Sequence, residues 1–173
     1  MRTLAFLYLT FLLSACATAP AGNGSTASSS SNTATATQTQ SFIAAMEAKR
    51  GSALTLAERL QVQGLTGTAK VGLNNTQNNF LNKIGAQVGL DGAVIAALFP
   101  EAGKPLSETA VVAKIESRLG KKLAAADQAA VKTAAALRNN SLASLKTGLA
   151  ASIGSRIGLS TEVVLALMPM LGL

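Results

Sequence analysis

An internal repeat constrains the fold of this chain more than any other sequence feature. Segment 43–100 aligns without a gap to segment 112–169, at a constant offset of 69 residues. The match is clearest where IGAQVGL (84–90) aligns with IGSRIGL (153–159). Further matched pairs are Glu47 and Glu116, Gly51 and Gly120, Leu54 and Leu123, Val62 and Val131, Val94 and Val163, Ala97 and Ala166, Leu98 and Leu167, and Pro100 and Pro169. The repeat predicts two copies of one structural unit.

Both copies have the apolar spacing of amphipathic helices. Apolar residues recur three or four positions apart, which places them on one helical stripe. These residues are Phe80, Leu81, Ile84 and Val88 in the first half, and Leu142, Leu145, Leu149, Ile153 and Ile157 in the second. No strand-like alternation is needed to explain either half, so we expect an all-α fold.

The ends of several helices can be predicted from capping residues. Thr55 and Glu58 have capping-box spacing, and Asp91 and Ser160 stand at N-cap positions. Helix C-termini are predicted at Gly51, Gly120 and the second glycine of each Gly-xxx-Gly pair, Gly85/Gly89 and Gly154/Gly158. We expect these pairs to serve tight internal packing rather than helix dimerisation in a membrane. Pro100 and Pro169 close the last short helix of each half.

These signals predict a pseudo-symmetric all-α domain of about eight short helices over residues 41–173, with halves 41–104 and 105–173. The last helix of each half is apolar on nearly every face and therefore requires burial. We expect the two last helices to pack together. Insertion of this helix into lipid, or its pairing with a second molecule, is the alternative, although its length is too short to span a bilayer.

The first residues have the order of an export signal. Arg2 supplies a positive charge, and residues 4–13 are apolar except for Thr10. This apolar run is too short for a permanent membrane span. It ends in Leu13-Ser14-Ala15-Cys16, which resembles the lipobox of bacterial lipoproteins. An ordinary signal peptide cleaved after Ala19 is the alternative.

The resemblance covers residues 1–16 only. It implies a signal peptide over 1–15, diacylglycerol and an N-acyl chain on Cys16, and attachment to a membrane of the cell envelope. Three acyl chains would make the attachment effectively permanent, because each buried methylene contributes about 0.8 kcal/mol. Ala17 stands where lipoproteins retained in the inner membrane of Gram-negative bacteria commonly have aspartate. In such a host the outer membrane, facing the periplasm, is therefore favoured.

Residues 16–40 predict a flexible linker behind the anchor. Residues 17–40 carry no charge and consist almost entirely of Ser, Thr, Ala, Asn, Gln and Gly, which bury too little apolar surface to repay ordering. At about 5–6 Å times the square root of its length, such a segment reaches roughly 25–30 Å.

The residue types of catalysis and of metal binding are scarce. The chain has no histidine, and its one cysteine is Cys16, so the usual general bases, thiol nucleophiles and soft metal ligands are missing. We therefore predict no catalytic residues, no metal and no cofactor. A hydrolase with paired carboxylates remains the third functional hypothesis, because carboxylate pairs can form in space.

Positive charge concentrates in the second half. Without Arg2 the chain carries a net charge of +6, of which +2 falls in 41–104 and +4 in 105–173. The candidate anionic-surface residues are Lys114, Arg118, Lys121, Lys122, Lys132 and Arg138. Such residues attract anionic lipid head groups, lipopolysaccharide or acidic glycans. Ordinary solvated helix surface is the simpler explanation of the same residues. Export and the few phenylalanines argue against nucleic acid.

The leading functional hypothesis is a non-catalytic envelope lipoprotein whose helical domain binds a partner protein or an anionic envelope surface. The second is a carrier of a small apolar or lipid ligand in a cavity between the halves, lined by Val94, Leu98, Val163 and Leu167. The sequence does not determine the oligomeric state.

Overall fold

The computed structural model describes residues 29–173, with their side chains from residue 36 onward. The predicted signal peptide, Cys16 and the linker up to residue 28 lie outside the described residues. The described part is all-α, as predicted, and contains no strand. Its elements are α1 (Ser29–Arg50), α2 (Leu56–Val88), α3 (Gly92–Leu98), α4 (Glu108–Leu119), α5 (Ala125–Ile157), α6 (Thr161–Leu167) and the 3-10 helix η1 (Met168–Leu171).

The prediction of about eight short helices is wrong, because α2 and α5 each continue for 33 residues. Gly64, Gly67 and Gly72 lie inside α2 without ending it. A glycine costs a helix about 1 kcal/mol relative to alanine but keeps its backbone hydrogen bond. The long contact of α2 with α5 outweighs that cost.

The helix bounds follow the offset of the sequence repeat. Both ends of α2 and α5 differ by 69 residues, and so do both ends of α3 and α6. The helices α1 and α4 also end at equivalent positions, Arg50 and Leu119. The two halves therefore contain the same succession of a first helix, a long helix and a short helix.

The capping residues act as predicted. Thr55 and Glu58 form a reciprocal capping box at α2, and the side chains of Asp91 and Ser160 accept hydrogen bonds from Ala93 N and Val163 N. Left-handed glycines end three helices: Gly120 follows α4, and Gly89 and Gly158 follow α2 and α5. These local signals explain where α2, α3 and α6 begin and where α2, α4 and α5 end.

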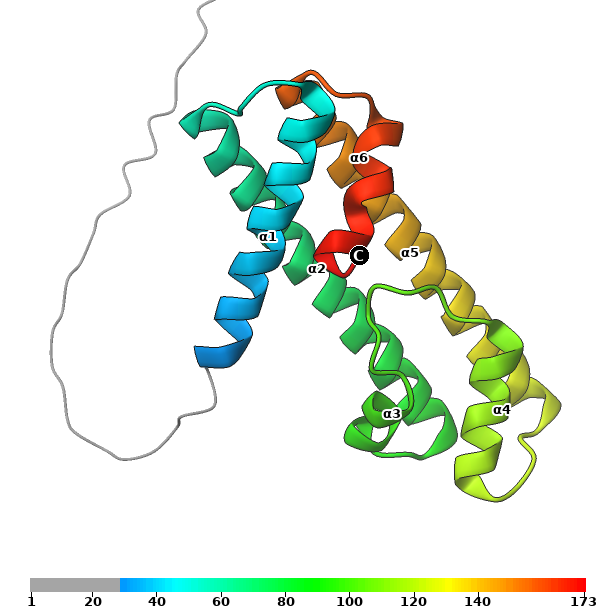
Figure 1. The fold of residues 1–173 in the computed structure, drawn as a ribbon. Coiled ribbons are helices and arrows are strands. Elements are labelled where there is room, and N and C mark those ends of the chain that lie inside the picture. The colour runs from blue at the N-terminus through cyan, green and yellow to red at the C-terminus, as the bar shows by residue number, and fades with distance from the viewer. Residues whose placement is uncertain (1–28) are drawn as a thin grey trace, which may run out of the picture.

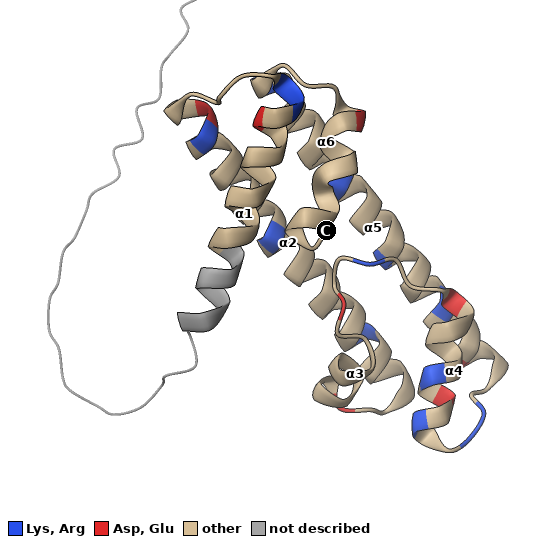
Figure 2. Cartoon of the chain, in the orientation of Figure 1, with Lys and Arg blue, Asp and Glu red and all other residues tan. Residues whose placement is uncertain are grey.

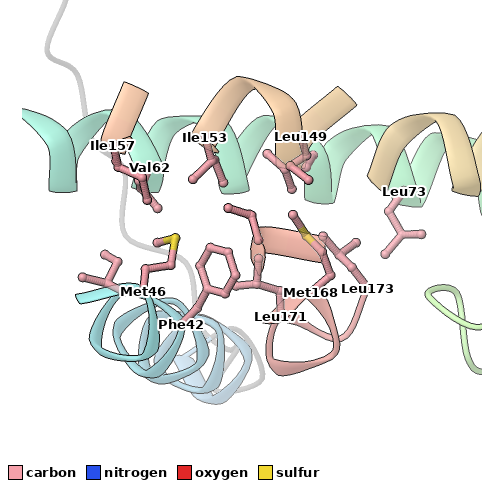
Figure 3. Packing of buried hydrophobic residues seen from close by; sticks show 14 of the residues in the cluster. Phe42, Met46, Val62, Leu73, Leu149, Ile153, Ile157, Met168, Leu171 and Leu173 are labelled. Carbon is pink, nitrogen blue, oxygen red and sulfur yellow. The ribbon is translucent and has the colours of Figure 1, made fainter. Parts of the chain in front are cut away.

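The molecule has two hydrophobic cores, and each is built from both halves of the chain. The first core joins α1 and the first part of α2 to the second part of α5, α6 and η1; Figure 3 shows Phe42 and Met46 of α1 facing Val62, Ile153 and Ile157. The second core joins α4 and the first part of α5 to the second part of α2 and to α3. Its buried residues include Phe80, Ile84, Ile95, Val111, Ile115 and Val131.

The expected pairing of the two short apolar helices is wrong. Ile95 of α3 lies in the second core and Val164 of α6 in the first, and Figure 1 shows α3 and α6 at opposite ends of the molecule. The reason is the antiparallel arrangement of α2 and α5 (Figure 1). This arrangement places α3, at the end of the first half, beside α4 of the second half, and α6, at the end of the second half, beside α1 of the first.

The first helix of the structure includes residues that the sequence analysis placed in the linker. The helix α1 begins at Ser29, so residues 29–40 are helical. Near residue 41 this part of α1 is in contact with the rest of the domain: Thr39 is buried, and Lys70 Nζ lies 3.4 Å from Gln38 Oε1.

No single helix in the described part is long and apolar enough to cross a membrane. Only α5 together with the segment Thr161–Leu171 meets the length and hydropathy criteria, and that pair is bent by 119°.

Alanine at two of the α2 glycines should stabilise the protein. A Cβ at Gly64 or Gly67 meets nothing within 4 Å, so each Gly→Ala change should raise the free energy of unfolding by about 0.4–1 kcal/mol. Urea denaturation followed by circular dichroism would measure this. Gly154→Ala is the contrasting variant, because its Cβ would lie 2.6 Å from Leu159 O, and it should destabilise. A lower midpoint for Gly64→Ala would contradict the prediction.

Candidate functional site

Four of the six candidate cations lie on α4 or directly after it. Lys114 and Arg118 are one helical turn apart and therefore share a face of α4. Lys121 and Lys122 follow directly after the left-handed Gly120 that ends this helix. Figure 2 shows the basic residues on α4 and on the loop that follows it, at the end of the molecule where α3 also lies.

A shallow groove runs between α3 and α4 beside these cations. It is lined by Ala93, Val94, Ala97 and Leu98 of α3 and by Ala113, Lys114, Ser117 and Arg118 of α4. We call these eight residues the α3–α4 groove. A second hollow adjoins it at Ala113 and Ser117 and extends to Lys121 and Lys122. The floor thus consists of small and apolar side chains, and the rim is cationic.

The cations of this end differ in how they are held. Lys114 Nζ donates to Leu98 O at 3.2 Å and lies 5.5 Å from the centre of the Phe99 ring. Lys122 Nζ lies 2.7 Å from Glu116 Oε2, so its charge is partly offset. Within residues 36–173, Arg118 and Lys121 have no carboxylate within ion-pair distance. Three cations are therefore available to an external anion.

Glu116 shapes the loop that carries Lys121 and Lys122. Its carboxylate accepts hydrogen bonds from Lys122 Nζ, from Leu123 N at 3.1 Å and from Gln128 Nε2 at 3.1 Å. These hydrogen bonds hold the pKa of Glu116 below its ordinary value, and the bond from Lys122 has the largest effect. The role of Glu116 is to fix the turn after α4.

The first half contains the same carboxylate arrangement. Glu47 accepts a hydrogen bond from Leu54 N at 2.8 Å and another from Arg59 at 2.7 Å, and both donors stand 69 residues before the donors to Glu116. The bond from Leu54 N, chiefly, lowers the pKa of Glu47. A carboxylate present in both halves serves the shared fold.

Arg138 does not belong to the cationic surface. Its side chain is 3% exposed and donates to Gln77 Oε1 at 2.7 Å and to the carbonyls of Glu101, Ala102 and Lys104. These acceptors take the place of a carboxylate for a cation that burial would otherwise penalise. Desolvation lowers the pKa of Arg138. Lys132, on α5, is half-buried and does not line the α3–α4 groove.

The predicted apolar cavity between the halves is not formed by the four residues chosen for it. Leu98 packs against the second core and Leu167 against the first. Val94 and Val163 lie on the same two separated helices. Because α3 and α6 are at opposite ends, the structure brings the residues together only in pairs.

Sequence analysis missed the small residues that open the groove. Ala113 and Ser117 are spaced four apart on α4, next to the two cations at 114 and 118. This alternation of small and basic residues could have predicted the α4 side of the groove. The α3 side could not be predicted from it, because it depends on how α3 packs against α4. The equivalent positions in the first half make the contrast clear: Lys114, Arg118, Lys121 and Lys122 correspond to Ala45, Lys49, Ser52 and Ala53.

The described residues do not bring together a metal site. No group of three or more Asp, Glu, His or Cys side chains in 36–173 is arranged to hold a metal ion. The glutamates whose pKa is displaced, Glu47, Glu58, Glu116 and Glu162, all have it lowered. A general acid at neutral pH needs a raised pKa instead.

Comparison with known proteins identifies no relative. No protein-family model matches the chain, and the searches of curated proteins and of solved structures give no significant match.

Replacing Glu116 should change how stability depends on pH. Because the folded-state pKa of Glu116 is lowered, its contribution is present above the ordinary glutamate pKa of about 4.3 and is lost as the pH falls through that range. Glu116→Gln should therefore be less stable than wild type at neutral pH, with a smaller difference at about pH 3. Thermal unfolding across this range would test it. Glu108→Gln, on the exposed first turn of α4, controls for the charge change. A difference independent of pH would contradict the assignment.

Proposed function

We propose that this protein is a non-catalytic lipoprotein of the bacterial envelope whose helical domain docks onto an anionic membrane surface. The observation that supports docking is the concentration of Lys114 and Arg118 at the α3–α4 groove and of Lys121 and Lys122 at the adjoining hollow, where Glu116 is the one carboxylate among the described lining residues. Anionic lipid head groups are the abundant negative charges next to a lipid-anchored domain.

The anchor leaves the α3–α4 end free to approach the bilayer. In Figure 1 α1 and α2 diverge, and the first turn of α1 lies to one side of α3 and α4. Residues 17–28 separate Cys16 from α1, and as the flexible linker that the sequence predicts they would reach about 20 Å. An anchor at Cys16 would therefore allow the domain to turn its α3–α4 end toward the bilayer.

The strength of docking matches this role. Each basic residue near an anionic leaflet contributes about 1 kcal/mol, so three available cations contribute about 3 kcal/mol. That is weak for a free protein but sufficient for one already held at the surface, because the anchor raises its effective concentration. Docking would be reversible while attachment is permanent.

We further propose that the two halves arose by duplication and that only the second acquired the anionic-surface site. The shared features, such as Glu47 and Glu116 and the matched helix bounds, belong to the fold. The cations at 114, 121 and 122 have neutral equivalents in the first half.

Charge reversal in the groove should weaken binding to anionic vesicles. In soluble Cys16→Ala protein, Arg118→Glu should lower the affinity for vesicles of phosphatidylglycerol and phosphatidylcholine by about tenfold or more, since two units of charge contribute about 2 kcal/mol. Lys49→Glu changes the net charge equally at the equivalent position of α1 and should have a smaller effect. Co-sedimentation at low salt would measure both.

The same measurement can contradict docking. Equal losses for Arg118→Glu and Lys49→Glu would show that net charge alone matters. Failure of the wild-type domain to bind, together with salt-insensitive capture of one envelope protein in cells, would replace the membrane surface by a protein partner.

Lipidation should depend on Cys16. Cells given labelled palmitate should incorporate it into the wild-type chain and not into Cys16→Ala, because the thioether and the new amino terminus both require the cysteine. Gel fluorography of the immunoprecipitated protein would show this. Ser14→Ala, which keeps a small residue before the cysteine, is the matched control and should be labelled normally. Equal labelling of wild type and Cys16→Ala would refute the anchor.

A further inference from the structure

We infer that the α3–α4 groove binds a single anionic phospholipid, with one acyl chain on its apolar floor and the phosphate between Lys114 and Arg118. This inference rests on the proposed membrane docking and specifies its ligand. It requires a hollow with an apolar wall and cations at its rim, and the structure offers an observation for each.

The hollow results from short side chains on two neighbouring helices. Ala97 of α3 and Ala113 and Ser117 of α4 leave space that longer residues would fill. Val94 and Leu98 supply the apolar wall, and both are half-buried, so each keeps a face exposed to the groove. An acyl chain placed there would cover apolar surface that water now contacts, at about 0.8 kcal/mol per buried methylene.

The rim offers two different phosphate donors. Lys114 is held in place by Leu98 O and the Phe99 ring, and its ammonium has three hydrogens, so it can also donate to an external oxygen. Arg118 lines both parts of the groove and has no carboxylate partner among the described residues. A guanidinium binds phosphate oxygens in bidentate geometry.

The combination of cations and an apolar wall favours a lipid over a soluble inorganic anion. A free phosphate would satisfy the cations but leave the apolar wall uncovered. The groove is shallow and open, so only part of a lipid would lie in it while the second chain stays in the bilayer. The equivalent positions of the first half, Ala45 and Lys49, provide only one of the two cations, which makes that half an internal control.

Tryptophan reporters can test the position of the acyl chain, because the chain has no tryptophan of its own. Val94→Trp places the reporter at the groove, and Val163→Trp places it at the equivalent half-buried site on α6. Each variant, in the Cys16→Ala background, is bound to phosphatidylglycerol vesicles with or without bromine atoms on the acyl chains. We expect Val94→Trp to lose about half of its fluorescence on brominated vesicles and Val163→Trp to change little.

The outcomes separate this inference from the proposed function. If both variants bind and neither is quenched, docking stands and the acyl-chain site is wrong. If both are quenched alike, the domain inserts without a specific groove, and the site is again wrong. If neither variant nor the Cys16→Ala parent binds, membrane docking fails and the lipid site fails with it.

A second pair of variants makes the test independent of the tryptophan substitutions. Ala113→Gln places a neutral polar side chain on the groove floor, and Ala44→Gln makes the same change at the equivalent exposed position of α1. Losing contact with two methylenes would weaken vesicle binding by about tenfold, so Ala113→Gln should lower affinity and Ala44→Gln should not. Equal affinities would overturn the site.

Discussion

The antiparallel contact between α2 and α5 is the interaction on which the rest of the structure depends. At 1.5 Å per residue, helices of 33 residues are about 50 Å long, so each extends through both cores. The first part of α2 and the second part of α5 belong to one core, and their remaining parts belong to the other. Neither half of the chain completes a core alone. Each half therefore supplies the residues that the other half lacks in both cores.

The connection between the halves is held by two cations of α5. Arg138 donates to the carbonyls of Glu101, Ala102 and Lys104, and Lys146 Nζ donates to Gly103 O at 2.9 Å. At Gly103 a side chain would collide with the backbone of Gly172, its equivalent in the other half. The connecting segment thus lies where the two halves meet. Its carbonyls solvate a buried guanidinium, which explains why Arg138 serves the fold and not the surface.

Local sequence signals predicted where helices end better than they predicted which helices are in contact. The capping box at Thr55 and the N-caps Asp91 and Ser160 were predictable because each depends on residues within three positions of one another. The continuity of α2 through Gly64, Gly67 and Gly72 was not predictable in this way, because it depends on contacts with α5, which is far away in the sequence. The position of Arg138 also depends on distant carbonyls. Four of the six candidate cations were found at one site because Lys114 and Arg118 share a helix face and Lys121 and Lys122 follow that helix directly.

Comparison between the halves separates residues that serve the fold from residues that could serve binding. Glu47 and Glu116 each accept a hydrogen bond from the backbone N–H of the leucine seven residues later. A side chain at Gly85 or Gly154 would collide with the backbone carbonyl of the leucine five residues later. These positions are therefore constrained by the structure. The structure sets no such requirement at 114, 121 and 122, because Ala45, Ser52 and Ala53 occupy equivalent positions in the same fold. Lys114 and Lys122 make contacts within the second half, to Leu98 O and Glu116, whereas Lys121 has no carboxylate within ion-pair distance among the described residues. The proposed external anion would use the charge that these contacts leave available, and the adjoining apolar wall of Val94 and Leu98 would favour an anion that carries a hydrocarbon chain.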